Sequence, residues 1–76
     1  MRKEQIQDID AGVIGETIRE RRTYYGMSQT ELAYRVGIHR ATLLDIERGV
    51  KIPRLDVAAR LSQALDFRSI DEMLGL

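Results

Sequence analysis

The side chains best suited to catalysis or metal binding are few, and their spacing matches no known catalytic arrangement. The chain has one histidine, His39, and no cysteine. His39 has no second histidine at HExxH spacing and no serine in a nucleophile elbow, so neither a zinc site nor a catalytic triad is indicated. The glycines do not follow a predicted strand, as a nucleotide-binding loop would require. We therefore predict no enzyme activity, no metal and no cofactor, and we interpret His39 as a polar residue at a helix start.

Basic side chains suggest a different chemistry, the binding of an anion. Arg48, Lys51 and Arg54 carry three positive charges within seven positions. Such residues are often only solvated, but beside a suitable helix they can neutralise phosphates. The whole chain has 12 Lys+Arg and 12 Asp+Glu, a net charge of zero. Binding to a polyanion must therefore depend on a local patch and not on overall attraction.

The size and composition favour one small folded domain. The chain has 76 residues, of which 43% are hydrophobic and 32% charged, which is ordinary for a folded domain. It contains no long apolar run of the kind found in signal peptides and membrane spans. We therefore expect a cytoplasmic protein with no membrane partner.

The N-terminal part predicts a polar arm and one helix. Residues 1–11 are mostly polar and are assigned to an N-terminal arm, so the folded domain is expected over residues 12–76. Between Gly12 and Gly26, the residues Ile14, Ile18 and Tyr25 form one apolar stripe with helical spacing.

A capping box marks the next helix. In the sequence Ser28-Gln29-Thr30-Glu31, the Ser28 hydroxyl is expected to accept from the Glu31 N–H, while the Glu31 side chain returns to the Ser28 N–H. Gly37 ends this helix, and a third helix over residues 39–48 ends at Gly49. The outer face of the third helix is left free to enter a groove about 12 Å wide.

Two further helices complete an all-α fold. The first has its apolar positions at Leu55, Ala58, Leu61 and Leu65, and the second begins at a capping box over residues 69–72. The expected core consists of Ile14, Ile18, Leu32, Val36, Leu43, Ile46, Leu55, Leu61, Leu65 and Phe67.

Two motifs carry a resemblance to a known family. They are Met27-Ser28-Gln29-Thr30-Glu31-Leu32-Ala33 before the turn and Ile46-Glu47-Arg48-Gly49 after the third helix. With Val36-Gly37-Ile38 between them, this stretch resembles the helix-turn-helix domain of the Cro and phage-repressor family, also called the XRE family. The resemblance covers about residues 14–74. It implies a five-helix, lambda-repressor-like fold and double-stranded DNA as the partner.

The resemblance also implies roles for individual residues. Base-reading positions are Arg40, Ala41, Leu44 and Asp45, and the fork of Arg40 suits the O6 and N7 atoms of guanine. Phosphate-contacting positions are Ser28, Gln29, His39, Thr42, Arg48, Lys51 and Arg54. Gln29 matches a residue that also braces a base-reading side chain. Arg22 and Glu47 match a partly buried ion pair between the first and third helices.

Four positions depart from the family pattern. His39 replaces the usual Ser or Thr cap of the third helix, so the cap must come from the imidazole or from Thr42, or be weaker. Arg54 replaces a Ser cap in the same way. Leu44 could meet a thymine methyl group, and Asp45 could accept from cytosine N4 or pair with Arg48.

Two functions remain open at this point. The first is a transcriptional repressor that binds a palindromic operator as a homodimer, with an interface formed by Ile70, Met73, Leu74 and Leu76, unless these residues only close the core. The second is an antitoxin that neutralises a toxin partner and regulates its own operon.

Overall fold

The computed structural model describes residues 9–76, which form five α-helices and no strand. The helices are α1 (Ala11–Tyr24), α2 (Gln29–Val36), α3 (Arg40–Glu47), α4 (Leu55–Ala64) and α5 (Ile70–Leu74). The predicted all-α, five-helix fold is confirmed. Within residues 9–76, no helix has both the length and the apolar character needed to cross a membrane.

The predicted arm and the folded part do not meet at position 12. Residues 1–8 of the predicted arm lie outside the described residues. The carboxylate of Asp10 accepts from the N–H groups of Gly12 and Val13 and so caps α1, which begins at Ala11. The folded part therefore includes Asp10 and Ala11, because an Asp at this position satisfies N–H groups that the helix leaves without partners.

The predicted capping boxes form only in part. Ser28 Oγ accepts from the Glu31 N–H at 3.0 Å, as expected, but Glu31 pairs with Arg35 at 2.9 Å and does not return to Ser28. At the start of α5, Ser69 Oγ accepts from the Glu72 N–H, while Glu72 accepts from the Arg68 N–H. The predicted return bonds from Glu31 and Glu72 were therefore wrong. The Glu31 carboxylate pairs with Arg35, one turn further along α2, and the Glu72 carboxylate accepts from Arg68, the residue before Ser69.

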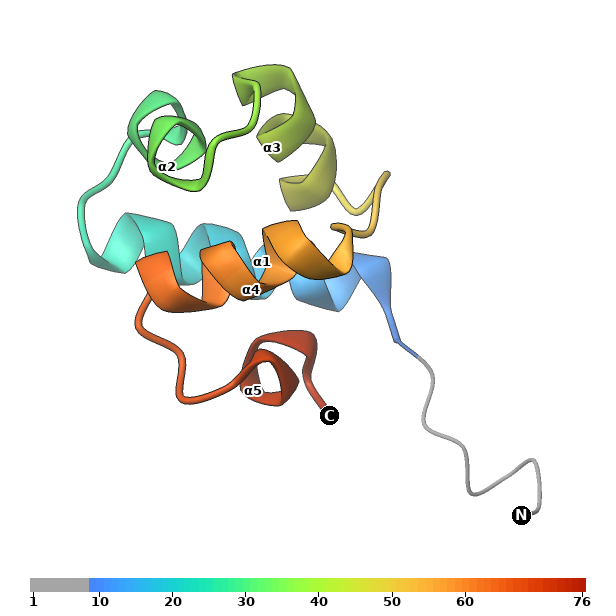
Figure 1. The fold of residues 1–76 in the computed structure, drawn as a ribbon. Helices are drawn as coiled ribbons and strands as arrows, with labels where there is room; N and C mark the ends of the chain where they lie inside the picture. The colour runs from blue at the N-terminus through green and yellow to red at the C-terminus, as the bar shows by residue number, and fades with distance from the viewer. Residues whose placement is uncertain (1–8) are drawn as a thin grey trace, which may run out of the picture.

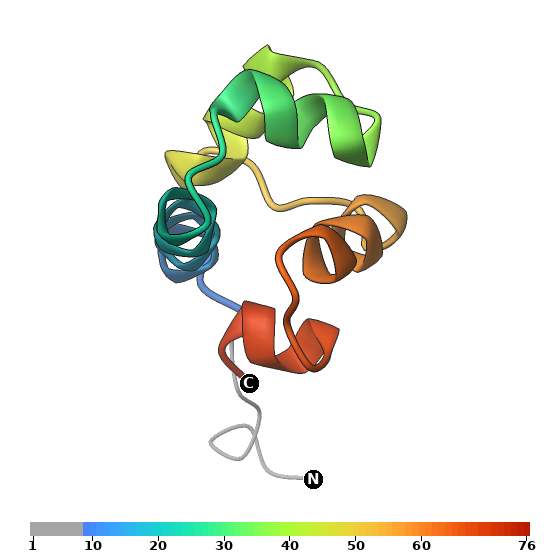
Figure 2. The same ribbon diagram turned by 90° about the vertical axis from the view of Figure 1, so that its left-hand side faces the viewer.

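The helices surround one core in three levels (Figure 1). At one end of the molecule, α2 and α3 pack together, and at the other end lies α5. In Figure 2, α1 and α4 lie between these ends on opposite sides of the core. α1 packs against α3 and α5, whereas α4 packs against α2 and α5. The two longest helices, α1 and α4, thus support the pair formed by α2 and α3.

The core contains every predicted residue except Leu55, and it also contains Met27, Ala33, Ala58 and Met73. Its buried residues are Ile14, Ile18, Met27, Leu32, Ala33, Val36, Leu43, Ile46, Ala58, Leu61, Leu65, Phe67 and Met73. Leu55 was expected here but is 75% exposed, because it is the first residue of α4 and lies beyond the end of the core. Tyr25 was expected on the buried stripe of α1 but is 43% exposed, because α1 ends at Tyr24.

Candidate nucleic-acid interface

The two faces of α3 have different surroundings. Leu43, Ile46 and Glu47 are buried against the rest of the fold. The predicted base-reading residues all lie on the remaining surface, with Arg40 and Ala41 exposed and Leu44 and Asp45 half-buried. Positions 40, 41, 44 and 45 share one side of an α-helix because of its 3.6-residue period. The structure therefore gathers these four residues on one accessible face.

Both α3 and α4 begin without a side-chain cap. His39 occupies the N-cap position of α3, and Arg54 that of α4, yet neither side chain accepts from its helix. Of the three alternatives for the start of α3, the structure therefore has the weaker cap, with none from the imidazole or from Thr42. An uncapped helix start keeps its N–H groups accessible to an anion. Of the other predicted phosphate contacts, Ser28 is exposed and Thr42 is half-buried.

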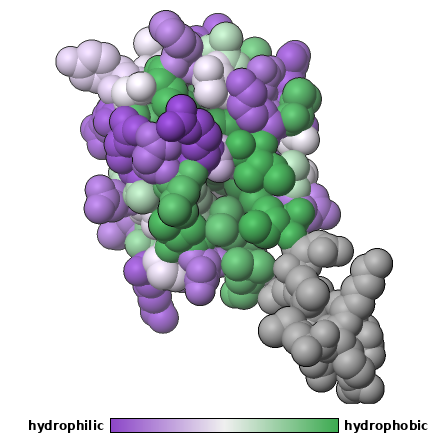
Figure 3. Space-filling model, turned by 45° about the vertical axis from the view of Figure 1, so that its right-hand side comes forward, coloured by the Kyte–Doolittle hydropathy of each residue, from purple (hydrophilic) through white to green (hydrophobic). Residues whose placement is uncertain are grey.

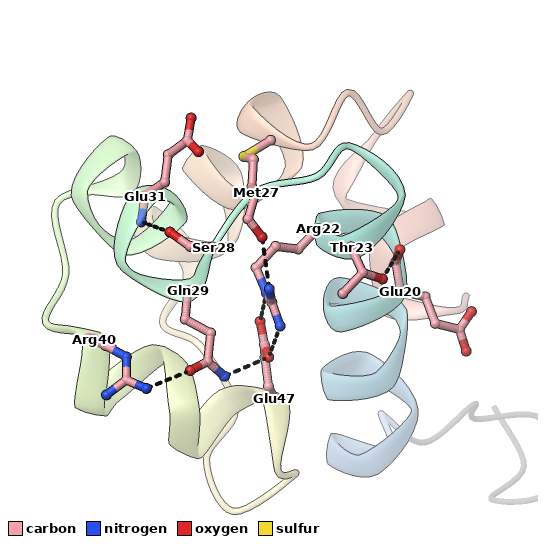
Figure 4. Close-up of polar contacts among 9 residues, drawn as sticks. All are labelled: Glu20, Arg22, Thr23, Met27, Ser28, Gln29, Glu31, Arg40 and Glu47. Atoms are coloured by element: carbon pink, nitrogen blue, oxygen red, sulfur yellow. Dashed lines mark hydrogen bonds and ion pairs between the residues drawn. The ribbon is translucent and has the colours of Figure 1, made fainter.

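A buried ion pair joins α1 to α3. Arg22 Nε donates to Glu47 Oε2 at 2.6 Å, and Arg22 Nη2 donates to Glu47 Oε1 at 3.0 Å (Figure 4). Arg22 Nη1 also donates to the backbone oxygen of Met27 at 2.9 Å. Each of the two charged residues is only 9% exposed. This fork-to-fork geometry fixes α3 relative to α1 and to the loop before α2.

Gln29 extends this network to the exposed face of α3. Its Nε2 donates to Glu47 Oε1 at 3.1 Å, and its Oε1 accepts from Arg40 Nη2 at 3.2 Å (Figure 4). The bond from Gln29 to Glu47 was missed by sequence reasoning. Its only signal in the sequence is a glutamine in the first turn of one helix and an acidic residue at the end of the next. A continuous chain of hydrogen bonds thus runs from the buried ion pair to Arg40.

The loop after α3 folds back on the end of that helix. The backbone oxygen of Asp45 accepts from the N–H groups of Val50 at 2.9 Å and Lys51 at 3.3 Å. Gly49 has φ of 77°, and a β-carbon there would lie 2.9 Å from the Cα of Gly12 in α1. This tight turn needs glycine. It leaves Arg48, Lys51 and Arg54 exposed beside α3.

Two acidic residues, Asp45 and Asp56, lie near this basic loop, but only Asp56 pairs with one of its arginines. Among the ion pairs of residues 9–76, none joins Asp45 to Arg48, whereas Arg54 Nε lies 3.6 Å from Asp56 Oδ1. Arg60 Nη2 lies 3.0 Å from the other Asp56 oxygen. Desolvation acts to raise the pKa of Asp56, but the Val57 N–H and the two guanidinium groups outweigh it and lower that pKa. One of the predicted phosphate-contacting residues therefore already has an acidic neighbour.

The predicted dimer residues divide into a core group and a surface group. Met73 is 0% exposed, so its assignment to an interface is wrong, and it packs inside the core instead. Ile70 and Leu74 are half-buried against the core. Leu76 is 50% exposed. Only part of the predicted surface is therefore accessible to a second molecule.

Comparison with known proteins identifies the family. A family model described as "Helix-turn-helix" matches residues 18–73. An uncharacterized HTH-type transcriptional regulator of Methanothermobacter thermautotrophicus is 41% identical over 59 residues, which are 78% of this chain and 86% of the relative.

Two solved structures have a similar fold. The restriction-modification controller protein C.AhdI from Aeromonas hydrophila has a TM-score of 0.78 at 34% identity, covering 84% of this chain and 96% of the controller. The hypothetical transcription factor NHTF from Neisseria has a TM-score of 0.77 at 27% identity, covering 97% of this chain and 80% of that protein. HTH-type regulators are a non-enzymatic class. The chain therefore belongs to the Cro/C1-type (XRE) helix-turn-helix family of DNA-binding transcriptional regulators.

Proposed function

We propose that the chain is a repressor that binds a partly palindromic operator as a homodimer through the exposed face of α3. The observation that carries this proposal is the position of Arg40, which lies on that face and is held by Gln29 at 3.2 Å. A guanidinium restrained in this way is suited to the O6 and N7 atoms of guanine. The antitoxin hypothesis gains no support from the relatives described above.

The remaining contacts follow from the same placement. Ala41, Leu44 and Asp45 are proposed to meet base edges next to Arg40. The residues proposed to contact phosphates are Ser28, Gln29, His39, Thr42, Arg48, Lys51 and Arg54. With a net charge of zero, the protein lacks strong long-range attraction to DNA. Specific contacts and dimerisation must then provide most of the affinity.

A second copy is needed because one recognition helix reads only a few base pairs. Two half-sites about 34 Å apart give a longer and more selective site. We assign the second copy to the apolar surface made by Val13 and Leu76, with the half-buried Ile70 and Leu74 beside them. A β-carbon at Gly75 would lie 3.6 Å from Val13, so the chain end lies against the start of α1.

Figure 3 shows apolar side chains gathered on the side of the molecule where α1 begins. In a two-fold symmetric contact, each residue of the surface meets an identical surface. An uncharged apolar patch meets its own copy without like-charge repulsion, and it gains from the burial of both surfaces.

Three measurements test the function. A duplex selected from a random pool should bind at least about 10³-fold tighter than random DNA. The log of the binding constant should fall with log salt by about 0.9 for each phosphate contact. Expression of a reporter whose promoter overlaps the selected site should fall when the protein is produced. Absence of selective binding rejects DNA recognition, and a rise in reporter expression rejects repression.

Light scattering tests the dimer. The unmodified protein should give the mass of two chains, while Leu76→Asp and Val13→Asp should shift the equilibrium towards the monomer without loss of helical circular dichroism. Tyr34→Asp is the matched control, since Tyr34 is exposed on α2. An unchanged dimer in both test variants would place the interface elsewhere.

A further inference from the structure

The carboxylate of Glu47 makes more contacts than an ion pair between two helices requires. Oε2 accepts from Arg22 Nε at 2.6 Å, while Oε1 accepts from both Arg22 Nη2 at 3.0 Å and Gln29 Nε2 at 3.1 Å. Glu47 therefore contacts α1 through one partner and the first turn of α2 through the other (Figure 4). The second contact leads towards the surface.

Only one orientation of the Gln29 amide suits both of its neighbours. A carboxylate only accepts hydrogen bonds, and a guanidinium only donates them. The amide nitrogen of Gln29 must therefore face Glu47, which it does at 3.1 Å, and the amide oxygen must face Arg40, which it does at 3.2 Å. In the reverse orientation, the amide oxygen would face a carboxylate and the amide nitrogen a guanidinium. Glu47 thus decides which end of Gln29 is presented to Arg40.

We infer that Glu47 is a positioning residue for base reading. This inference rests on the proposed function, in which Arg40 contacts a base. By fixing the Gln29 amide, Glu47 supplies Arg40 with an acceptor for one Nη2 hydrogen and leaves its other donors available for guanine. A side chain that is restrained before binding loses less entropy on binding. The buried ion pair therefore holds the fold together and also sets the selectivity of the exposed arginine.

Three variants separate positioning from folding. Glu47→Gln removes the charge that fixes the Gln29 amide, but it also leaves Arg22 buried without a charged partner. Gln29→Met removes the link to Arg40 and keeps the ion pair. The double variant Arg22→Met with Glu47→Leu removes both buried charges, a change that buried ion pairs often tolerate. Glu31→Gln is the matched control, since it breaks the exposed ion pair with Arg35 in α2, the helix that also carries Gln29.

The first readout is discrimination at one base pair. The probes are a duplex selected by the unmodified protein and its variants at the base pair where Arg40→Ala loses selectivity. The ratio of the two affinities does not depend on the folded fraction, because partial unfolding lowers both affinities by the same factor. A purely structural role of Glu47 would therefore leave the ratio unchanged.

For the unmodified protein we expect a ratio of roughly 5-fold to 150-fold. Glu47→Gln, Gln29→Met and the double variant should each lower this ratio several-fold, and Glu31→Gln should keep it. An unchanged ratio in Glu47→Gln and in the double variant would overturn the inference. A decrease in Gln29→Met alone would also overturn it, since Gln29 would then act without Glu47.

The second readout needs no DNA. Nitrogen relaxation of the Arg40 Nε–H group in the free protein should give a lower order parameter in the three test variants than in the unmodified protein and Glu31→Gln. Equal order parameters would overturn the inference. If the unmodified protein selects no duplex, the proposed function fails, and the relaxation data still decide whether Glu47 restrains Arg40.

Discussion

Gly15 of α1 lies directly against the backbone oxygen of Ile46 in α3, so close that a β-carbon at position 15 would overlap that oxygen. The same β-carbon would lie 2.7 Å from the backbone oxygen of Glu47. Backbone atoms cannot rotate out of the way as a flexible side chain can. The absence of a side chain at Gly15 therefore sets how closely the recognition helix packs on α1.

Gly15→Ala should destabilise the fold. Overpacking costs about 1–3 kcal/mol or more, and the gain in helix propensity from Gly to Ala returns only about 1 kcal/mol. We expect a lower midpoint in urea unfolding. Gly12→Ala is the matched control, because its β-carbon would meet only the movable Asp10 carboxylate at 3.3 Å. Equal midpoints for the two variants would contradict the close approach of α1 to α3.

The elements that could be predicted were those with strong local signals. Ser28 and Gly37 fix the two ends of α2 through one hydrogen bond and one positive φ of 74°, and both effects depend on neighbouring residues only. Leu55 was placed wrongly because apolar spacing does not reveal where a helix leaves the core. Met27 and Met73 were missed from the core because flexible side chains fill gaps that only the packed fold defines.

Only part of the candidate site could be predicted, namely which residues share one face of α3. Arg40 and Asp45 share one face through helical periodicity alone. The contact between Gln29 and Glu47 joins residues 18 positions apart in sequence, and it exists only because α2 packs on α3. Whether the Glu31 side chain pairs with Ser28 or with Arg35 was also unpredictable, since both residues are about one turn away.

Removing one partner of the buried ion pair should cost far more stability than removing both. Arg22→Met leaves the charge of Glu47 buried, so we expect a loss of roughly 3–5 kcal/mol in the free energy of unfolding. With Glu47→Leu added, most of this loss should be recovered, because no buried charge remains. Urea unfolding of the single and double variants checks this. Additive losses would show that Glu47 is well solvated without Arg22.

Loss of an exposed ion pair provides the control for that comparison. Arg35→Ala removes the partner of Glu31, and both side chains are about half exposed. Pairs of this kind contribute only about 0.3–0.5 kcal/mol. A large loss of stability in Arg35→Ala would mean that the effect of Arg22→Met does not arise from burial.

Arg40→Ala and Arg54→Ala should affect DNA binding in different ways. Arg40→Ala is expected to cost about 1–3 kcal/mol and to relax selectivity at one base pair. Arg54→Ala should weaken binding to all sequences alike and lower the salt slope by about 1. Binding titrations against a set of single-base-pair variants at two salt concentrations check both. Uniform weakening by Arg40→Ala would show that Arg40 does not contact a base.

Asp56→Asn should strengthen DNA binding and make folding less dependent on acid pH. Asp56 lies 3.6 Å from Arg54, so loss of its charge frees that guanidinium for a phosphate.

Because the pKa of Asp56 is lowered in the folded state, its stabilising effect is present above the unfolded pKa of about 3.9 and is lost as the pH falls through the folded value. The unmodified protein should therefore be more stable than Asp56→Asn at pH 6, with a smaller difference at pH 2. Thermal unfolding at the two pH values measures this difference, and a larger difference at low pH would contradict the assigned direction.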